Sequence, residues 1–240
     1  MKKHITWKKV LLTILIICIT WITSIVSIGF IRYRTLISEQ PLPDKITAIQ
    51  KKKTYVRISD ISPVFLDAII AIEDPPFYSH HGVLLSNILE AGITNLKEKK
   101  LAMGGSTITQ QLAKNIYLDQ DKHFTRKTAE LFFVHDLEGT LTKNQILELY
   151  LNVIYFGDGY YGIQEAAQGY FHKSPSELNA AEASLLAGLP QAPAVYQLSS
   201  GYKEARIRQK EVLKAMVENH MINEEESAEI YKKNLNQEYS

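Results

Sequence analysis

Residues 69–82 read IIAIEDPPFYSHHG, and the remaining motifs of the chain are best understood from this stretch. Its apolar start ends in two adjacent carboxylates, Glu73 and Asp74, which two prolines, two aromatic residues and two histidines follow. An ionisable group next to a buried apolar run is costly unless it is paired or used in chemistry. The stretch by itself leaves two interpretations of Glu73 open: a solvated acid at a helix end, or a catalytic acid.

The sequence around this stretch has the spacing of helices. Ser62-Pro63 is typical of a helix start, and Pro75-Pro76 ends the predicted helix just after Glu73. Further helices are predicted at residues 84–96, from Thr107, from Thr125, at 142–153, at 179–186, at 202–220 and at 223–233, with an extended segment at 188–196. No period-two pattern persists and no repeat is visible, so the sequence predicts a mainly α fold.

Composition excludes some classes of protein. The chain has 240 residues, 45% hydrophobic and 22% charged, which is ordinary for a globular domain with an anchor. A net charge of +1 argues against a protein that binds nucleic acid. The one cysteine, Cys18, allows no internal disulfide and lies in an apolar segment, so we assign it no chemistry.

Residues 10–31 form an uncharged apolar run of 22 residues. As a helix it is roughly 33 Å long, which is enough to cross a bilayer core. Four lysines precede the run and two arginines, Arg32 and Arg34, follow it, so we expect the N-terminus in the cytoplasm and the remainder outside. A cleaved signal peptide is the alternative, but the run is longer than is usual for one and has no Ala-x-Ala site.

These observations predict four parts of the chain. They are a cytoplasmic N-terminus (1–9), a transmembrane anchor (10–31), a polar stalk stiffened by Pro41 and Pro43 (32–60), and a helical domain (61–240). Apolar residues at 84–101 are expected to extend the contact with membrane lipid.

Two carboxylates and three cations stand out in the predicted helices. Glu73 and Glu130 both lie on helices with apolar faces. Three cations lie near the ends of neighbouring helices: Lys114, Arg126 and Lys127. This combination suits a reaction in which a carboxylate deprotonates a hydroxyl and cations stabilise an anionic leaving group. A pair of carboxylates also suits glycoside hydrolysis, so residue types leave both reactions open.

Five strings carry a more specific signal than the charges. They are EDPPFYSHHG (73–82), GGSTITQQLAKN (104–115), RKTAE (126–130), KNQILELYLNVIYFG (143–157) and ASLLAGLPQAPAVY (183–196). In this order they resemble the five motifs of the peptidoglycan glycosyltransferases, glycosyltransferase family 51. The third string is unspecific by itself, but the five together extend over nearly the whole predicted domain.

The resemblance implies a lysozyme-like helical fold and a reaction on lipid II, the disaccharide-pentapeptide carried on undecaprenyl pyrophosphate. Glycan strands would be polymerised with inversion at the anomeric carbon and release of undecaprenyl pyrophosphate. Glu73 matches the family's general base, and Glu130 its second essential carboxylate. Lys114, Arg126 and Lys127 match cations that hold the pyrophosphate.

Other expectations follow from the same resemblance. Further substrate-binding residues would be Asp74, Ser106, Thr107, Gln110, Gln111 and Asn115. No histidine pair has the spacing of a built-in metal site, so any Mg²⁺ or Mn²⁺ would be shared by Glu130 and pyrophosphate, and no organic cofactor is expected. A structural rather than chemical role is expected for His80, His81, Glu148, Asn152, Tyr155, Phe156, Tyr160 and Tyr161.

The chain departs from the family at Pro76, where members commonly have arginine, and residues 135–138 (HDLE) are more polar than expected. Neither departure removes a residue with a chemical role. Two alternatives stay open: a lytic peptidoglycan glycosidase, and a non-catalytic cell-wall scaffold of the same fold. Because the sequence ends at Ser240, we expect a monofunctional enzyme at the bacterial cell membrane, with the growing glycan strand, transpeptidases and other cell-wall synthesis proteins as partners.

Overall fold

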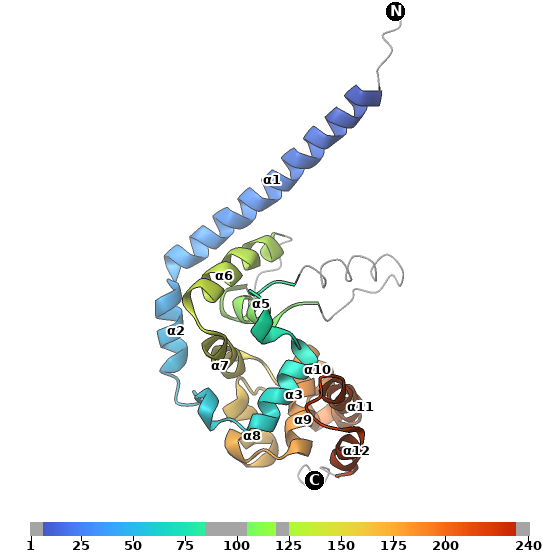
Figure 1. Cartoon of the computed structure of the whole chain (residues 1–240). Coiled ribbons are helices and arrows are strands. Elements are labelled where there is room, and N and C mark those ends of the chain that lie inside the picture. Colours follow the sequence, from blue (N-terminus) through green and yellow to red (C-terminus); the bar gives the residue numbers. More distant parts are fainter. Residues whose placement is uncertain (1–6, 85–104, 119–124, 234–240) are drawn as a thin grey trace, which may run out of the picture.

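The computed structural model describes residues 7–84, 105–118 and 125–233 (Figure 1). In these residues the chain forms helices and turns without a strand, and Tyr155 and Tyr161 form an isolated β-bridge. The mainly α fold is therefore confirmed. The helix predicted at 84–96 and most of the apolar segment 84–101 lie outside the described residues.

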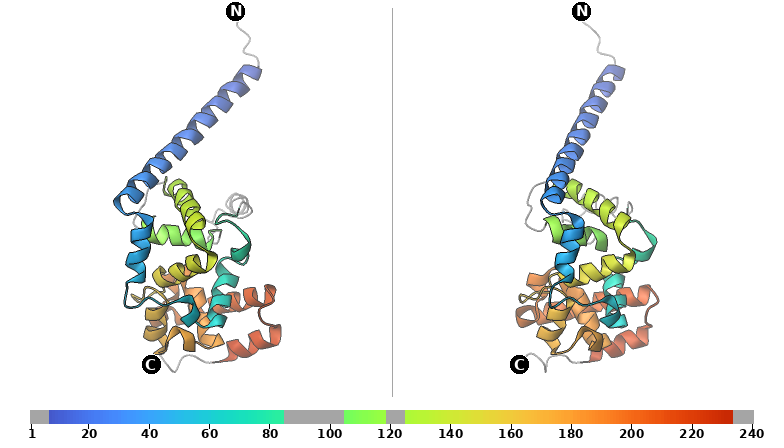
Figure 2. Two further views of the ribbon diagram at one scale, coloured as in Figure 1. Left: turned by 60° about the vertical axis from the view of Figure 1, so that its left-hand side comes forward. Right: turned by 90° about the vertical axis from the view of Figure 1, so that its left-hand side faces the viewer.

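The first helix, α1 (Trp7–Glu39), has 33 residues and stands away from the rest of the chain in all three views (Figures 1 and 2). Most of its apolar side chains are exposed, and its most apolar window has a mean hydropathy of 2.5. By length and composition it can cross a membrane. Because α1 continues to Glu39, its last turns lie beyond the predicted span of residues 10–31.

The last turns of α1 pack against α6 (Arg126–Thr140). Gly29 permits the contact, because a Cβ there would lie 2.5 Å from the Cβ of Thr128. One turn later, the Tyr33 hydroxyl donates a hydrogen bond to Asp136 Oδ2 at 2.5 Å. Asp136 belongs to the unexpectedly polar segment 135–138, and its position shows that this segment holds the anchor.

Residues 32–60 differ from the stalk that we expected. They include α2 (Leu42–Gln50), whose Leu42 and Ile49 are buried in the core, as is Val56 beyond it. Pro41 and Pro43 flank the first residue of this helix, where a proline's missing N–H costs nothing. Asn152 then binds the backbone N–H and C=O of Val56 at 2.8 Å each, so this segment is part of the domain.

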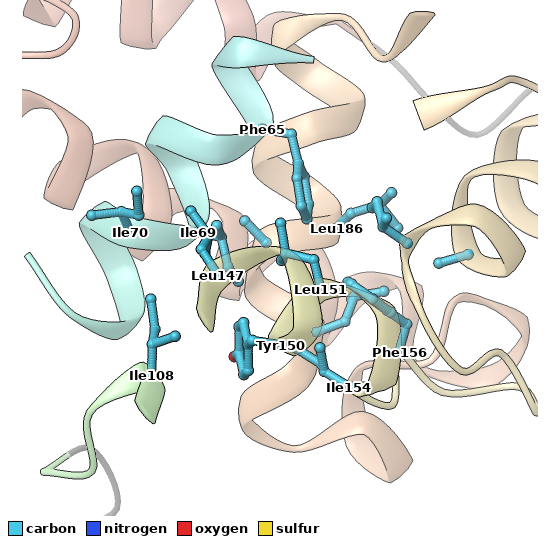
Figure 3. Packing of buried hydrophobic residues seen from close by; sticks show 14 of the residues in the cluster. Phe65, Ile69, Ile70, Ile108, Leu147, Tyr150, Leu151, Ile154, Phe156 and Leu186 are labelled. Carbon is cyan, nitrogen blue, oxygen red and sulfur yellow. The ribbon is translucent and has the colours of Figure 1, made fainter. Parts of the chain in front are cut away.

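The core lies where α3 (Pro63–Glu73), α9 (Ala180–Gly188) and α11 (Leu198–Glu218) pack against one another, and side chains of α7 (Lys143–Val153) contribute to it. Figure 3 shows Phe65, Ile69, Leu147, Tyr150 and Leu186 packed together there. Every residue of α9 from Ala181 to Gly188 is buried, as expected for a helix surrounded by others. The carboxyl end of α3, which carries Glu73, is therefore fixed by the core.

Most of these helices begin at or near the residues that the sequence predicted. Thr107, Thr142 and Asn179 form the capping boxes of α5 (Ile108–Ala113), α7 and α9. Ser62 differs, because its hydroxyl donates to the carbonyl of Leu178 and not to its own helix. The prediction of an extended segment at 188–196 is wrong. This segment contains η5 (Leu189–Gln191) and α10 (Pro193–Tyr196), because proline is compatible with the first turn of a helix.

The remaining elements are short or peripheral. They are η1 (Ile58–Asp60), η2 (Phe77–Ser79), the π-helical turn η3 (Lys114–Leu118), α8 (Ile163–Phe171), η4 (Pro175–Glu177) and α12 (Glu224–Lys232). The predicted helices at 202–220 and 223–233 correspond to α11 and α12.

Candidate active site

Glu73 is the last residue of α3 and is held by a chain of hydrogen bonds. Gln111 Nε2 on α5 donates to Glu73 Oε2 at 2.6 Å, and Gln111 Oε1 accepts from the Tyr150 hydroxyl at 3.1 Å. Because Tyr150 is fully buried on α7, it fixes the orientation of the amide. Three helices therefore determine the direction of one carboxylate.

The environment of Glu73 favours its neutral form. Its Oε1 is inaccessible to solvent and has no hydrogen-bond partner among the described residues. Burial raises the pKa of Glu73 above its usual value, against the lowering effects of Gln111 and the Arg208 charge, and Asp74 raises it further. Glu73 is half-buried and hydrogen-bonded to Gln111, so it is not a fully solvated acid at a helix end. A carboxylate with one oxygen unoccupied and a raised pKa is suited to accept a proton.

Asp74 has a different environment and a different role. It is buried, and its carboxylate accepts from His80 Nε2 at 2.8 and 3.0 Å and from the Ile108 backbone N–H at 3.0 Å. His80 Nδ1 accepts from the Gly82 N–H at 2.9 Å, so the proton of the imidazole lies on Nε2. Asp74 thereby joins the loop after Glu73 to the N-terminus of α5, and His80 has the structural role that we expected.

Thr107 and Gln110 connect this loop to the second carboxylate. Thr107 Oγ1 donates to the carbonyl of Gly82 at 2.6 Å and accepts from the Gln110 N–H at 3.1 Å. Gln110 Oε1 accepts from the Thr107 N–H at 3.1 Å, and its Nε2 donates to Glu130 Oε1 at 3.0 Å. One amide thus completes a capping box and holds Glu130.

Glu130 is buried on α6 and lies in a basic and polar cluster. Lys127 Nζ is 2.5 Å from Glu130 Oε1 and 3.2 Å from Ser106 Oγ. The Lys127 side chain is 55% exposed, whereas that of Glu130 is 4% exposed. Glu130 therefore holds an ammonium group at the surface of the site.

The other two predicted cations have no ion pair in the part of the chain that the structure describes. Lys114 begins the π-helical turn η3 directly after α5, and Arg126 is the first residue of α6. Both are half-buried. Irregular π-turns are frequent at functional sites. Among the described residues, no acidic side chain neutralises either charge.

Asn115 lies apart from both carboxylates. It lines a hollow of about 410 Å³ whose wall also contains Lys45, Lys52, Tyr155 and Tyr161. The two tyrosine rings are 4.6 Å apart. The structure thus places Asn115 on a neighbouring concave surface, between α2, η3 and the end of α7.

The described residues offer no complete ligand set for a resident metal ion. The described ranges contain no group of three or more His, Cys, Asp or Glu side chains that could hold one. The carboxylate expected to share a metal, Glu130, already pairs with the ammonium of Lys127. We therefore derive no chemical step through a metal.

Comparison with known proteins decides the family. The sequence profile of the transglycosylase family matches residues 42–217. The chain belongs to the transglycosylase family. It is 43% identical to penicillin-binding protein 1A of Neisseria gonorrhoeae over 173 residues. These residues make up 72% of this chain and 22% of that protein. It is also 43% identical over 178 residues to a Cupriavidus necator protein named as a transglycosylase, which covers 74% of this chain and 77% of that protein.

Longer relatives extend beyond this chain. Penicillin-binding protein 2D of Bacillus subtilis is 40% identical over 185 residues, which are 27% of its length. The crystal structure of penicillin-binding protein 1A from Haemophilus influenzae aligns with 75% of this chain and 17% of its own, with 23% identity and a TM-score of 0.43. This transglycosylase-family chain spans about a fifth of the length of the penicillin-binding protein 1A relatives.

Some residues of this transglycosylase-family site were missed by sequence reasoning. Tyr150 lies in the fourth motif, but its hydrogen bond to Gln111 could not be foreseen. Arg208, on α11, lies outside every quoted motif, and its charge acts on Glu73. Glu138 accepts hydrogen bonds from Thr109 at 2.5 Å and from Lys143 at 2.8 Å, which joins α6 to α5 and α7.

The residues expected to be structural have such contacts. Glu148 accepts from the Ile58 N–H at 2.8 Å and from the Tyr55 hydroxyl, so Glu148 and Asn152 together hold residues 55–58. Phe156 is fully buried, and Tyr160 packs against Tyr170. These residues support the domain and lie away from the two carboxylates.

Proposed function

We propose that this chain is a peptidoglycan glycosyltransferase that polymerises lipid II into glycan strands, with inversion at the anomeric carbon and release of undecaprenyl pyrophosphate. One observation carries the proposal: adjacent amides of α5, on Gln110 and Gln111, hold two different carboxylates. Of these two carboxylates, Glu130 is the one that forms an ion pair with a described cation, Lys127. The site therefore has a basic side for an anionic leaving group and an opposite side for a proton acceptor.

On the acceptor side, Glu73 takes the proton of the 4-hydroxyl of the acceptor sugar. The O4–C1 bond forms as the bond from C1 to the phosphate oxygen breaks, and the pyrophosphate leaves with that electron pair. Attack from the face opposite the leaving group inverts C1. Gln111 donates to Oε2 of this carboxylate, and Oε1 accepts no hydrogen bond from a described residue, so the group keeps capacity to accept the proton. General-base catalysis of this kind contributes about 10²–10⁴ in rate.

On the leaving-group side, Arg126, Lys114 and Lys127 stabilise the charge that develops on the pyrophosphate. Cations fixed beforehand need no reorganisation during the reaction, which is the main advantage of such a site. Glu130 is a positioning residue here, because it holds the Lys127 ammonium group. A divalent cation would be held jointly by Glu130 and the substrate's pyrophosphate.

The anchor suits a substrate carried on a polyprenyl chain, because both are then confined to one membrane. Tyr33 and Gly29 bind α1 to α6, the helix that carries Arg126 and Lys127. The excess of lysine before residue 10 supports a cytoplasmic N-terminus and a catalytic domain on the outer face. Transpeptidases that cross-link the product are the proposed partners.

The two alternatives are less well supported. A lytic glycosidase needs no cations for a pyrophosphate, so the unpaired Lys114 and Arg126 would have no purpose in it. A non-catalytic scaffold was suggested by Pro76, but Pro76 is exposed before η2 and leaves the Asp74–His80 contact in place.

The test uses the full chain in detergent with labelled lipid II and, separately, with finished peptidoglycan. Polymer formation by the wild type and its loss in Glu73→Gln support the proposal. Release of muropeptides from finished peptidoglycan without polymerisation would establish the lytic alternative. Binding of lipid II without turnover would establish the scaffold.

A further inference from the structure

Arg208 is a buried cation that no motif accounts for. It lies on α11, which packs against α3 and α9, and its exposed fraction is 8%. Gly188 on α9 makes room for its stem, because a Cβ there would lie 2.8 Å from Arg208 Cγ. The next residue, Gln209, fixes the rotation of α11 by donating to the Ala181 carbonyl at 2.9 Å and to Ser184 Oγ at 2.8 Å.

The guanidinium of Arg208 is only partly satisfied. One terminal nitrogen donates to Glu211 Oε2 at 2.5 Å, but the Glu211 side chain is 60% exposed and lies toward solvent. The Nε of Arg208 is buried and has no partner in the described chain. A buried guanidinium cannot lower its cost by losing its proton, because arginine stays charged in proteins. Its ion pair among the described residues is with the exposed Glu211, so the buried Nε of the guanidinium is left without a partner there.

Glu73 has a buried acceptor atom, Oε1, that also lacks a hydrogen-bond partner among the described residues. Among the described residues, the buried side-chain polar atoms without a partner are Glu73 Oε1 and Arg208 Nε, an acceptor and a donor. They lie on α3 and α11, which pack against each other. The Arg208 charge also acts on the Glu73 carboxyl and opposes the effect of burial.

We propose that Arg208 is a positioning residue whose charge acts across the packed helices α3 and α11 and keeps the Glu73 carboxylate ionised for its role as the base. The inference rests on the proposed role of Glu73 as the base, and it adds a residue that the family motifs do not contain. Burial disfavours the ionised form of Glu73, and the Arg208 charge favours it. The two effects act in opposite directions on the carboxyl that serves as the base in the proposed function.

Other groups around Glu73 do not supply this charge. They are Asp74 in the following loop, the neutral Gln111 of α5, Tyr150 of α7, and His80, which is bonded to Asp74. Asp74 opposes ionisation, and Tyr150 stays neutral because burial and the two carboxylates raise its pKa well above its usual value. Within the described residues, Arg208 is the cation whose charge acts on Glu73.

The first measurement is the pH dependence of kcat/KM for lipid II polymerisation in Arg208→Gln and Arg208→Lys. Without the cation Glu73 is protonated at higher pH, so Arg208→Gln should lose activity on the order of tenfold near pH 6 and less as pH rises. Arg208→Lys keeps the charge and should retain the wild-type profile. The control is Lys214→Gln, since Lys214 is an exposed cation on the same helix. A uniform loss at all pH values, or equal profiles for Gln and Lys, overturns the inference.

The second measurement needs no activity. Arg208→Gln is made in the wild type and in Glu73→Gln, and thermal unfolding of all four proteins is followed at about pH 8 and about pH 4. The inference is supported if Arg208→Gln lowers the Tm more in the wild type than in Glu73→Gln at about pH 8, and if this difference becomes smaller at about pH 4. Additive effects at about pH 8 overturn it. If the two substitutions have non-additive effects on Tm but the protein does not polymerise lipid II, the proposed function alone is refuted. If the protein polymerises lipid II but the effects on Tm are additive, the role of Arg208 alone is refuted.

Discussion

Gln110 and Gln111 are adjacent on α5, yet their side chains bind carboxylates on different helices. Gln110 Nε2 is 3.0 Å from Glu130 Oε1 of α6, and Gln111 Nε2 is 2.6 Å from Glu73 Oε2 of α3. Neighbouring residues on a helix point about 100° apart, so this pair can separate two carboxylates and still fix both. The separation of the Glu73 and Glu130 carboxylates is therefore set by one turn of α5.

Gln111→Ala should lower kcat about 10- to 100-fold, because a hydrogen bond to a charged group contributes roughly 1.5–3 kcal/mol. The measurement is single-turnover polymerisation of lipid II, in which binding and chemistry are separated. The control is Gln168→Ala, an exposed glutamine on α8. An unchanged kcat in Gln111→Ala would show that Glu73 is oriented by other contacts.

Glu73→Gln should raise the Tm at neutral pH. Burial raises the folded-state pKa of Glu73 above the ordinary 4.5, so the stability that its neutral form provides is complete below about that pH. This stability is lost as pH rises through the raised folded-state pKa, and glutamine, which cannot ionise, avoids the loss. Thermal unfolding between pH 4 and about 8 checks the prediction, and the gain should disappear at the acidic end.

Glu177→Gln is the control of opposite sign. Hydrogen bonds from Ser174 hold the pKa of the exposed Glu177 below its usual value, so its carboxylate stabilises the fold above the ordinary carboxyl pKa. Its replacement should give an equal or lower Tm at neutral pH. A gain in Tm for both variants would attribute the effect to net charge and not to burial of Glu73.

Lys114→Gln should reduce kcat/KM for lipid II and leave the Tm unchanged, since Lys114 has no ion pair with a described residue. Lys127→Gln should reduce both, because it removes a partner of the buried Glu130, at about 1–3 kcal/mol of unfolding free energy. Kinetics and thermal unfolding of both variants are compared side by side. Equal losses of Tm would contradict the distinction.

Gly29→Leu should destabilise the docking of α1 on α6 by about 1–3 kcal/mol, because the new side chain would occupy the position of Thr128. Glu130 and Arg126 lie on α6, so polymerisation should also fall. The Tm and activity are measured in detergent micelles. Ser27→Leu, on an exposed position of the same helix, is the control and should behave as the wild type.

EDTA should leave the Tm of the substrate-free protein unchanged, because the described residues offer no complete ligand set for a metal. Thermal unfolding with EDTA and with added Mg²⁺ or Mn²⁺ provides the measurement. A Tm lowered by EDTA and restored by Mg²⁺ would reveal a metal site in the substrate-free protein.

Local sequence signals predicted local structure well. Helices begin after Thr107, Thr142 and Asn179, as predicted, because each of these residues forms a capping box with a side chain three positions later. The prediction of a stalk was wrong at residues 42–60, where the chain forms α2 and joins the domain. Prolines such as those at the start of α2 are found both in linkers and in the first turn of a helix, so the local sequence did not distinguish the two. Whether Leu42 and Ile49 are buried depends on α7, which lies about a hundred residues away.

The sequence by itself determined the helical class, the apolar anchor and, through five short strings, the acidic and basic residues of the site. Those features depend on residue type and on spacing along a helix, which are local properties. Only the tertiary structure decided that Gln111 connects Glu73 to Tyr150, that Asp136 holds the anchor through Tyr33, and that Arg208 acts on Glu73. Burial, the unpaired Oε1 and the pKa of Glu73 arise from helices distant in sequence that exclude water together, and no single segment contains that information.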